Sequence, residues 1–155
     1  EAQVGGKNKG EVNDSVRRSE LNWLNKDPEC LWVFEILASV VSSINADYFG
    51  FDLTGFSEAL QLTNYHEARQ GHYVWHQDFG ASGSSRKLSL VLQLSDPEDY
   101  EGGELQILTS GQATSMQKKR GRITVFPAWT LHQVTPVTKG HRQSLVAWLS
   151  GPNFK

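Results

Sequence analysis

After about residue 56 the chain changes from one hydrophobic period to another, and this change constrains the fold more than any other feature. The later part consists of short β-type runs separated by turns that contain Gly, Pro and Asp. We expect strands at 58–66, 72–78, 87–95, 103–109, 113–118, 122–126, 131–137 and 142–149. The predicted turns lie at 80–83, 96–99, 102–103, 111, 121 and 139–140. Such a series of short strands predicts a mainly β fold, a cupin-like jelly roll or another small β-barrel.

The residues before position 50 show a helical period instead. Asp27 and Pro28 are typical of a helix start, because Asp caps free N–H groups and Pro fits the first turn. Apolar residues then recur at helical spacing, which predicts a helix over 28–48 with Gly50 as its stop. Its apolar face consists of Cys30, Phe34, Leu37, Val41, Ile44 and Tyr48. We expect this N-terminal helix to pack on one sheet, and a short strand at 21–24 to precede it.

Size and charge are those of an ordinary soluble protein. The 155 residues fit one domain, 1–155, and the Gly- and charge-rich residues 1–18 predict a flexible loop. A net charge of −2 gives no reason to expect nucleic-acid or membrane binding, and the basic stretch 118–122 predicts a solvated turn. No apolar run could span a bilayer and no signal peptide is visible, so we expect a cytoplasmic monomer or weak dimer.

Because the chain begins at Glu1 rather than Met, we expect a truncated N-terminus. The single cysteine, Cys30, excludes an internal disulfide and reads as a small buried hydrophobe.

Two of the predicted strands show a clear alternation of side chains. Along 142–149, one face carries Arg142, Ser144, Val146 and Trp148, and the other carries Gln143, Leu145, Ala147 and Leu149. Along 87–95, alternate leucines form an apolar stripe that can pack under the helix, which turns Ser89, Val91 and Gln93 toward the barrel interior. An inward glutamine is costly in a dry core but favourable beside a polar ligand.

Three residues form the most informative chemical pattern. In an extended strand His76 and Asp78 point to the same face, so both can bind one ion from one side, and His132 would arrive from another strand. Two histidines and a carboxylate make the facial triad typical of non-haem Fe(II), which leaves positions open for other ligands. The spacing is equally compatible with a hydrogen-bonded His–Asp pair and an unrelated histidine.

Five segments, in order, carry motifs of a known family. They are Tyr65 with Tyr73-Val-Trp-His76-Gln-Asp78, Leu-Ser-Leu-Val-Leu-Gln-Leu-Ser-Asp at 88–96, Tyr-Glu-Gly-Gly-Glu-Leu at 100–105, Val-Phe-Pro-Ala-Trp-Thr-Leu-His-Gln-Val at 125–134, and Gly-His-Arg-Gln-Ser-Leu-Val-Ala-Trp at 140–148. Together they resemble the Fe(II)/2-oxoglutarate-dependent dioxygenase superfamily, and within it the prolyl/lysyl hydroxylase-type (prolyl 4-hydroxylase-like) branch. The resemblance extends from about Arg17 to Pro152 and implies a double-stranded β-helix.

The resemblance also implies roles for individual residues. His76, Asp78 and His132 match the iron ligands, and Arg142 matches the residue that pairs with the distal carboxylate of 2-oxoglutarate. A guanidinium suits that role because it binds a carboxylate bidentately and keeps its charge. The further positions implied around the cosubstrate are Tyr65, Ser144, Gln93 and Leu105. Collagen-type relatives usually carry lysine in place of Arg142, which argues for a different subgroup.

Four more residues are candidates for substrate binding. Tyr73, Trp148 and Trp129 are expected at the mouth of the barrel, and Arg18 lies in the N-terminal region that helps to form the substrate groove in relatives. The alternative for the aromatic residues is ordinary core packing. The alternative for Arg18 is a solvated loop.

The activity implied is hydroxylation of a C–H bond, above all of a prolyl residue in a peptide or protein. The cofactors implied are Fe(II), 2-oxoglutarate and O2, with ascorbate as reductant and succinate and CO2 as products. No side chain is expected to act as a general base. Three alternatives stay open: a lysyl hydroxylase, a hydroxylase of a small amino-acid-like molecule, and a non-catalytic metal-binding β-barrel. Nucleic-acid demethylation is disfavoured because no basic-aromatic stripe is present.

Overall fold

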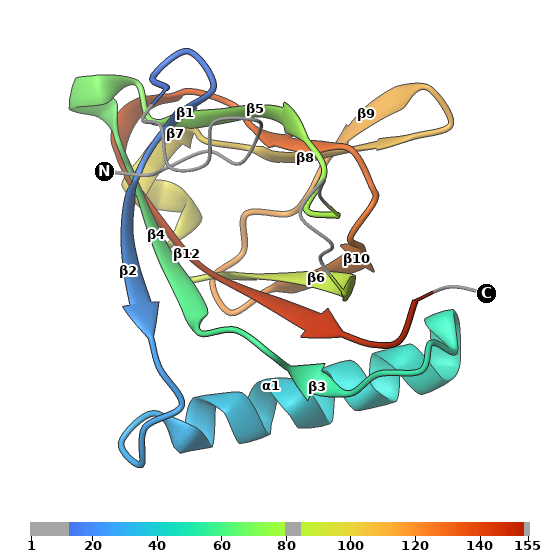
Figure 1. Ribbon diagram of the computed structural model, residues 1–155. Helices are drawn as coiled ribbons and strands as arrows, with labels where there is room; N and C mark the ends of the chain where they lie inside the picture. The colour runs from blue at the N-terminus through green and yellow to red at the C-terminus, as the bar shows by residue number, and fades with distance from the viewer. Residues whose placement is uncertain (1–12, 80–84, 154–155) are drawn as a thin grey trace.

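Two antiparallel sheets and one long helix make up the computed structural model of the chain, which describes residues 13–79 and 85–153 (Figure 1). The elements in chain order are β1 (Arg17–Arg18), β2 (Glu20–Leu24), α1 (Leu31–Ile44), η1 (Asn45–Phe49), β3 (Gly55–Phe56), β4 (Leu60–His66), η2 (Glu67–Arg69), β5 (His72–His76), β6 (Arg86–Gln93), η3 (Pro97–Asp99), β7 (Tyr100–Gly102), β8 (Leu105–Thr109), β9 (Gln112–Ser115), β10 (Ile123–Pro127), β11 (His132–Val134) and β12 (Val137–Ser150). The smaller sheet has the order β1-β5-β11-β8-β9, and the larger sheet has the order β10-β6-β12-β4-β2, with β3 and β7 also paired to β12. The predicted mainly β jelly roll is confirmed.

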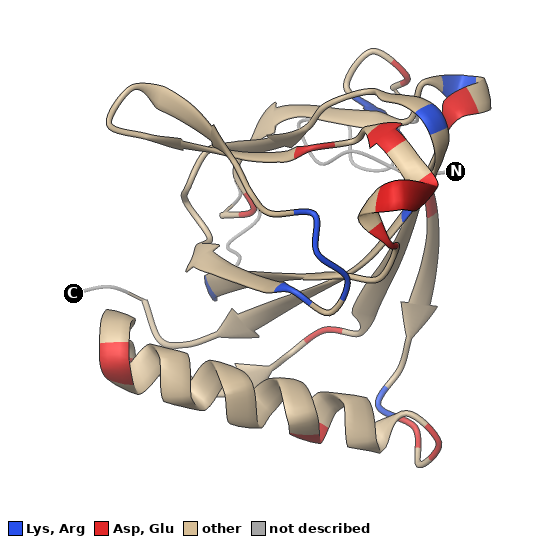
Figure 2. Cartoon of the chain, turned by 180° about the vertical axis from the view of Figure 1, so that it is seen from behind, with Lys and Arg blue, Asp and Glu red and all other residues tan. Residues whose placement is uncertain are grey.

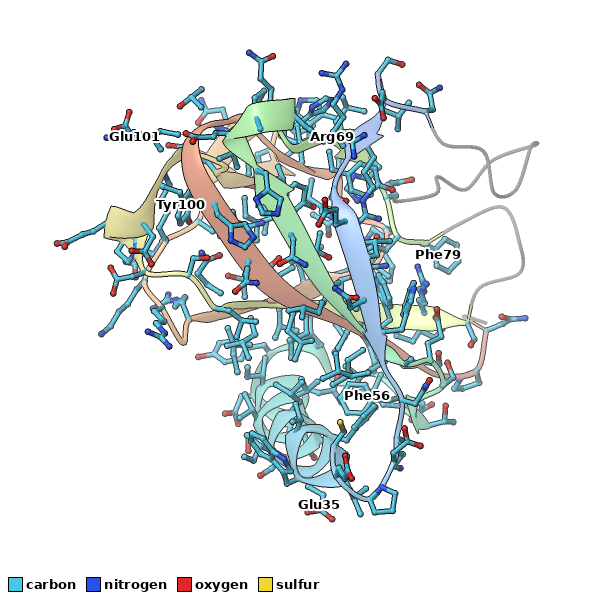
Figure 3. All side chains as sticks on the ribbon, turned by 90° about the vertical axis from the view of Figure 1, so that its left-hand side faces the viewer. Glu35, Phe56, Arg69, Phe79, Tyr100 and Glu101 are labelled. Carbon is cyan, nitrogen blue, oxygen red and sulfur yellow. The ribbon has the colours of Figure 1, made fainter. Side chains whose placement is uncertain are left out.

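Helix α1 lies across the outer face of the larger sheet, as expected (Figure 1). Its Phe34, Leu37 and Val41 are buried against leucines and alanine of β4, β6 and β12. Full burial of each large apolar side chain contributes roughly 1.5–3 kcal/mol, so this contact is the main reason for the helix to stay on the sheet. In Figure 3 Phe56 points toward this interface, where its ring meets that of Phe34 at 5.7 Å, and Glu35 points away from it.

The predicted helix 28–48 begins later than expected, and its regular part ends earlier. The helix begins at Leu31, because residues 28–30 form a turn in which the Cys30 N–H donates to the backbone carbonyl of Asp27. After Ile44 the chain makes a π-helical turn that Gly50 ends in a left-handed conformation, so the predicted stop is confirmed. A π-turn contains more residues than an α-turn and rotates the residues that follow. Tyr48 is therefore 80% exposed instead of joining the apolar face.

Strand β12 carries two different environments on its two faces. Leu145, Ala147 and Leu149 belong to the core beneath α1. Arg142, Ser144 and Trp148 are buried on the opposite face, inside the barrel. The predicted alternation is therefore confirmed along β12, and β6 follows it, since Leu88 and Leu90 face the helix while Val91 packs on the other side.

Three short strands and one continuous strand differ from the prediction. β1, β3 and β7 were not predicted, since two or three residues are too few to show a period. β1 ends the predicted loop 1–18 with a strand, and residues 1–12 of that loop and the predicted turn 80–83 lie outside the described residues. The predicted turn at 139–140 is wrong, because β12 continues through Gly140, with φ 74°, and pairs there with Tyr100 of β7.

The basic stretch 118–122 and Cys30 lie where the sequence predicted them. The basic stretch 118–122 connects β9 to β10 and turns at its exposed end (Figure 2). Cys30 is half-buried and packs against the core beneath α1. Among the described residues, no helix is both long enough and apolar enough to cross a membrane.

Candidate active site

His76, Asp78 and His132 converge at one end of the smaller sheet. His76 is the last residue of β5, and it lies directly opposite His132, the first residue of β11. Asp78 follows two residues later and places one carboxylate oxygen 3.7 Å from His76 Nε2 and the other 3.5 Å from His132 Nε2. The three candidate ligand atoms lie within 4.8 Å of one another. This separation suits a group of ligands around one cation.

The backbone fixes which nitrogen of each imidazole faces the carboxylate. His76 Nδ1 lies 2.7 Å from the Val74 carbonyl, and His132 Nδ1 lies 2.9 Å from the Thr130 carbonyl. A carbonyl can only accept, so each Nδ1 donates its proton, which in a neutral imidazole leaves the Nε2 lone pair facing the carboxylate. Neutral imidazoles held in this way by a backbone carbonyl are the usual form of metal-ligating histidines.

The charges at the site also match the needs of a cation. Burial, together with neighbouring His132, lowers the pKa of His76 to about 4, so its imidazole is neutral at physiological pH. Burial alone would raise the pKa of Asp78, but His132, His76 and the Ser89 hydroxyl together hold it below its usual value. An ionised carboxylate and neutral imidazoles are the protonation states that bind a metal.

The carboxylate of Asp78 is held by residues of both sheets and the segment after β10. Ser89 of β6 donates its hydroxyl to Asp78 Oδ2 at 2.6 Å, and the Asp78 N–H donates to the Ala128 carbonyl at 2.9 Å. The indole N–H of Trp148 on β12 also lowers the pKa of Asp78, although its geometry does not meet that of a hydrogen bond. Asp78 is thus fixed before any ligand arrives.

A column of stacked groups supports His76 on its other side. The ring of Tyr73 lies against the His76 imidazole with a centroid distance of 3.4 Å and an interplanar angle of 13°. The Arg17 guanidinium covers the other face of Tyr73 at 4.5 Å from the ring centroid. Strand β1 makes this possible because Arg17 pairs directly with Tyr73 across the two strands. Arg17 is buried, and it donates to Ser19 Oγ and to Gln61 Oε1, both at 2.8 Å.

Arg142 occupies a second part of the barrel interior. Its side chain is 2% exposed, its guanidinium lies 5.4 Å from the Tyr65 ring centroid, and its Nη1 donates to Ser144 Oγ at 3.4 Å. Among the described residues no carboxylate lies within salt-bridge distance of it. A buried cation without an anion is costly, so this guanidinium is poised for an anionic ligand.

A narrow cavity of about 10 Å³ lies beside Arg142. Gln93 and Leu105, both predicted to lie near the cosubstrate, line it together with Tyr100. Gln93 Nε2 donates to the Tyr100 hydroxyl at 3.0 Å. Burial raises the pKa of Tyr100, so its hydroxyl stays protonated and can act as a donor as well as an acceptor.

The three aromatic residues predicted to bind substrate lie in three different surroundings. Tyr73 lies at the metal-ligand candidates, and Trp148 is buried beneath the Arg86 guanidinium, which lies 3.8 Å from its ring centroid. Trp129 is 39% exposed and packs on Phe51 with a ring separation of 5.6 Å. The backbone carbonyl of Trp129 accepts a hydrogen bond from the side chain of Gln77.

Arg18, the fourth residue predicted to bind substrate, contacts other residues of the protein. It forms an ion pair with Asp14 at 3.6 Å and donates to the Arg69 carbonyl at 3.4 Å. These contacts tie β1 to η2. A role in substrate binding stays a prediction for Arg18, as it does for Trp129.

Four residues of the site were not given a role from the sequence. Ser89 was predicted to face inward, and Tyr100 lies in a quoted motif, so for these two the signal was present. Arg17 was predicted only as part of the N-terminal loop region, and Lys118 only as part of a solvated turn. Their burial depends on strand β1 and on the path of residues 116–122, and neither shows in the local pattern.

Comparison with known proteins agrees with this geometry. The family model described as 2OG-Fe(II) oxygenase superfamily matches residues 60–150. A PKHD-type hydroxylase of Synechococcus sp. (strain CC9605) is 42% identical over 79 residues, which cover 50% of this chain and 36% of the relative. A PKHD-type hydroxylase of Hyphomonas neptunium is 45% identical over 62 residues, 40% of this chain and 28% of the relative. The chain thus matches only about a third of the length of these relatives.

Solved structures show the same fold. A Pseudomonas putida prolyl-4-hydroxylase superimposes with a TM-score of 0.75 at 22% identity, covering 92% of this chain and 77% of that protein. A Trichoplax adhaerens prolyl hydroxylase, solved with a hypoxia inducible factor peptide fragment, gives 0.76 at 18% identity, covering 97% and 70%. The family model extends over more than half of the chain, from β4 to the end of β12. The chain belongs to the 2OG-Fe(II) oxygenase superfamily.

Proposed function

We propose that the chain is a dioxygenase that binds Fe(II) through His76, Asp78 and His132 and hydroxylates a C–H bond with 2-oxoglutarate as cosubstrate. The observation that carries this proposal is the convergence of two imidazole nitrogens and one carboxylate within 4.8 Å in a protein of this superfamily. Arg142, which is buried and has no ion-pair partner in the described part of the chain, is a second, independent support, since a purely structural metal site has no use for it.

The residues of the chain prepare the site in three ways. Backbone carbonyls orient both imidazoles, Ser89 holds the carboxylate, and the Tyr73 ring presses on His76. Such support fixes ligand geometry before binding and so strengthens metal affinity. The iron, when bound, supplies the oxidation of the C–H bond, with succinate and CO2 as the expected products and ascorbate as the expected reductant.

Arg142 is proposed to bind the distal carboxylate of 2-oxoglutarate. Its planar guanidinium can bind a carboxylate with two parallel N–H donors, in a pocket where water competes little. Ser144 and Tyr65 pack against the same guanidinium, and Gln93, Leu105 and Tyr100 form the wall of the cavity. Arg142 therefore offers the cosubstrate a buried charged contact, with several neutral groups beside it.

A prolyl residue in a peptide or protein is the proposed substrate. Support comes from two neighbours of the same fold, one described as a prolyl-4-hydroxylase and one solved with a peptide fragment. The aromatic residues Tyr73 and Trp148 lie beside the candidate ligands and are the proposed contacts of the proline ring.

Hydroxylation of a peptide panel tests the proposal. The protein is incubated with Fe(II), 2-oxoglutarate, ascorbate and proline- or lysine-containing peptides, and mass spectrometry follows the gain of one oxygen atom while succinate is quantified. We expect a proline peptide to be hydroxylated, with an equal amount of succinate formed.

Asp78→Ala should abolish both products, whereas Arg142→Ala should mainly raise the 2-oxoglutarate concentration required. Glu101→Ala, which removes an exposed ion pair with Lys139, is the control. Turnover that persists in Asp78→Ala and His76→Ala would refute the iron assignment.

A further inference from the structure

Three cations line the cavity beside Arg142, and none of the described residues that line it is acidic. Arg142 comes from β12. Lys118 and Arg122 come from the connection between β9 and β10, whose basic residues are drawn in blue in Figure 2. This positive charge is a local feature of the cavity, since the net charge of the whole chain is −2.

Lys118 lies close to a polar group that also contacts Arg142. Its side chain is half-buried, and its Nζ lies 4.7 Å from the ring centroid of Tyr100. The hydroxyl of the same tyrosine interacts with the side chains of Arg142 and Gln93. Lys118 and Arg142 therefore reach one tyrosine from two directions, one over the ring face and one at the hydroxyl.

No carboxylate of the described residues neutralises this pair of cations. Lys118 forms no ion pair within the described part of the chain. Glu104, the acidic residue that affects the pKa of Tyr100, accepts hydrogen bonds from Ser115 and Gln106 instead. Two like charges beside one buried aromatic ring repel each other, and an anion between them offsets this repulsion.

We propose that Lys118 is a second cationic contact for the distal carboxylate of 2-oxoglutarate, opposite Arg142. This inference rests on the proposed function. The planar guanidinium sets the orientation of the carboxylate, and the ammonium on its flexible stem adds a point charge from the solvent side. Lys118 then strengthens the selection of a dicarboxylate over a keto acid that ends in a methyl group.

Binding measurements separate this role from simple packing on Tyr100. 2-Oxoglutarate and pyruvate are each titrated by calorimetry into the Mn(II)-loaded protein, so that no turnover is needed. We expect Lys118→Met to weaken 2-oxoglutarate binding by about three- to ten-fold, as for a half-buried ion pair, and to leave pyruvate binding unchanged. Added salt should narrow the difference between wild type and variant.

Two further variants make the result specific. Lys119→Met removes the same charge from the neighbouring, exposed position that does not line the cavity, and we expect unchanged binding of both keto acids. Lys118→Arg keeps the charge and should retain most of the affinity. A melting temperature of Lys118→Met equal to wild type shows that the fold is intact.

The outcomes against the inference differ from those against the proposed function. The role of Lys118 would be overturned if Lys118→Met binds 2-oxoglutarate as tightly as wild type, or if it loses equal affinity for 2-oxoglutarate and pyruvate. The proposed function would still stand in that case, provided that Arg142→Ala abolishes tight binding of 2-oxoglutarate. If the Mn(II)-loaded wild type does not bind 2-oxoglutarate at all, the proposed function itself fails.

Discussion

Ser89 illustrates how a single side chain prepares the candidate metal site. It is fully buried on β6, in the larger sheet, and its hydroxyl reaches Asp78 beyond the end of β5 in the smaller sheet. The short contact of 2.6 Å is that of a charge-assisted hydrogen bond. Ser89 therefore fixes the carboxylate in the ionised state and in one orientation.

Replacing Ser89 by alanine should weaken metal binding by about tenfold, the lower end of the effect expected for a partner of a ligand. The physical reason is that Asp78 loses its donor and its orientation. Calorimetric titration with Mn(II) measures the change. Ser43→Ala, on the outer side of α1, removes only a bond to the Ser39 carbonyl and is the control. Equal affinity of Ser89→Ala and wild type would show that the hydroxyl does not position the carboxylate.

At the residue scale, strand period predicted much of the interior. The inward directions of Ser89, Gln93, Arg142 and Ser144 follow from alternation, because consecutive side chains of a strand point to opposite faces. What alternation cannot predict is which distant strand lies opposite. The stacking of Arg17 on Tyr73 depends on a two-residue strand and is invisible in the sequence.

Gly140 allows the long strand β12 to pair with β7 at one end. Its φ of 74° is left-handed, and a Cβ at this position would lie 2.0 Å from the Asp99 carbonyl oxygen. Only glycine fits such a close approach. Arg142, two residues later, depends on this part of the strand for its position.

Gly140→Ala should lower the free energy of unfolding by about 3 kcal/mol or more, because the backbone of η3 must move. Gly121→Ala is the matched control, since its φ is 80° but a Cβ there meets nothing within 4 Å. It should cost only about 1–2 kcal/mol, the penalty of the left-handed conformation. Urea unfolding measures both. Similar losses in the two variants would contradict the proposed clash.

His141 on β12 stacks on His66 of β4 and makes stability depend on pH. Their rings stack at 4.0 Å, and the two residues are directly opposite in the sheet. Burial and His66 lower the pKa of His141, whereas Glu20 acts in the opposite direction. The unfolded chain therefore binds a proton at this residue more readily than the native chain, so its contribution to stability is present above about pH 6.5 and is lost as the pH falls.

The unfolding midpoint in urea should therefore fall less in His141→Gln than in wild type between about pH 7.5 and about pH 5.5. The difference between the two proteins isolates the contribution of His141. His72→Gln is the control, because the ring of this half-buried histidine bonds, among the described residues, to the Gln70 carbonyl alone. An identical pH dependence in His141→Gln and wild type would exclude the pair as a source of acid sensitivity.

Sequence predicted the elements better than their ends. The strands β4, β6, β8 and β10 and the position of α1 follow from hydrophobic period, because one face of each must be buried. The helix start moved because the Asp27–Cys30 turn satisfies the backbone without a side-chain cap. The continuation of β12 through Gly140 depends on pairing with β7, a tertiary contact that local turn residues do not reveal.

The molecule as a whole places its candidate metal site between the two sheets. His76 and His132 belong to the smaller sheet, while Ser89 and Trp148 reach the same carboxylate from the larger one. A bound ion would therefore join segments that are far apart in the chain. Ligands that bind only the folded state stabilise it by mass action.

Mn(II) at about one hundred times its dissociation constant should raise the melting temperature by about 5–10 °C, from roughly 2.7 kcal/mol of added stability. Chelation with EDTA should reverse the shift, and Asp78→Ala should show none. Differential scanning calorimetry measures all three conditions. A shift of equal size in Asp78→Ala would mean that the ion binds elsewhere.

Strand β12 serves both halves of the protein at once, with Arg142 and Trp148 on its barrel face and Leu145 and Leu149 on its helix face. A single codon inserted or deleted within it would exchange the two faces along the rest of the strand. The guanidinium would then be driven under the helix or the leucines into the cosubstrate cavity. We therefore expect related chains to differ in length in the β9–β10 connection and to keep the same length within β12.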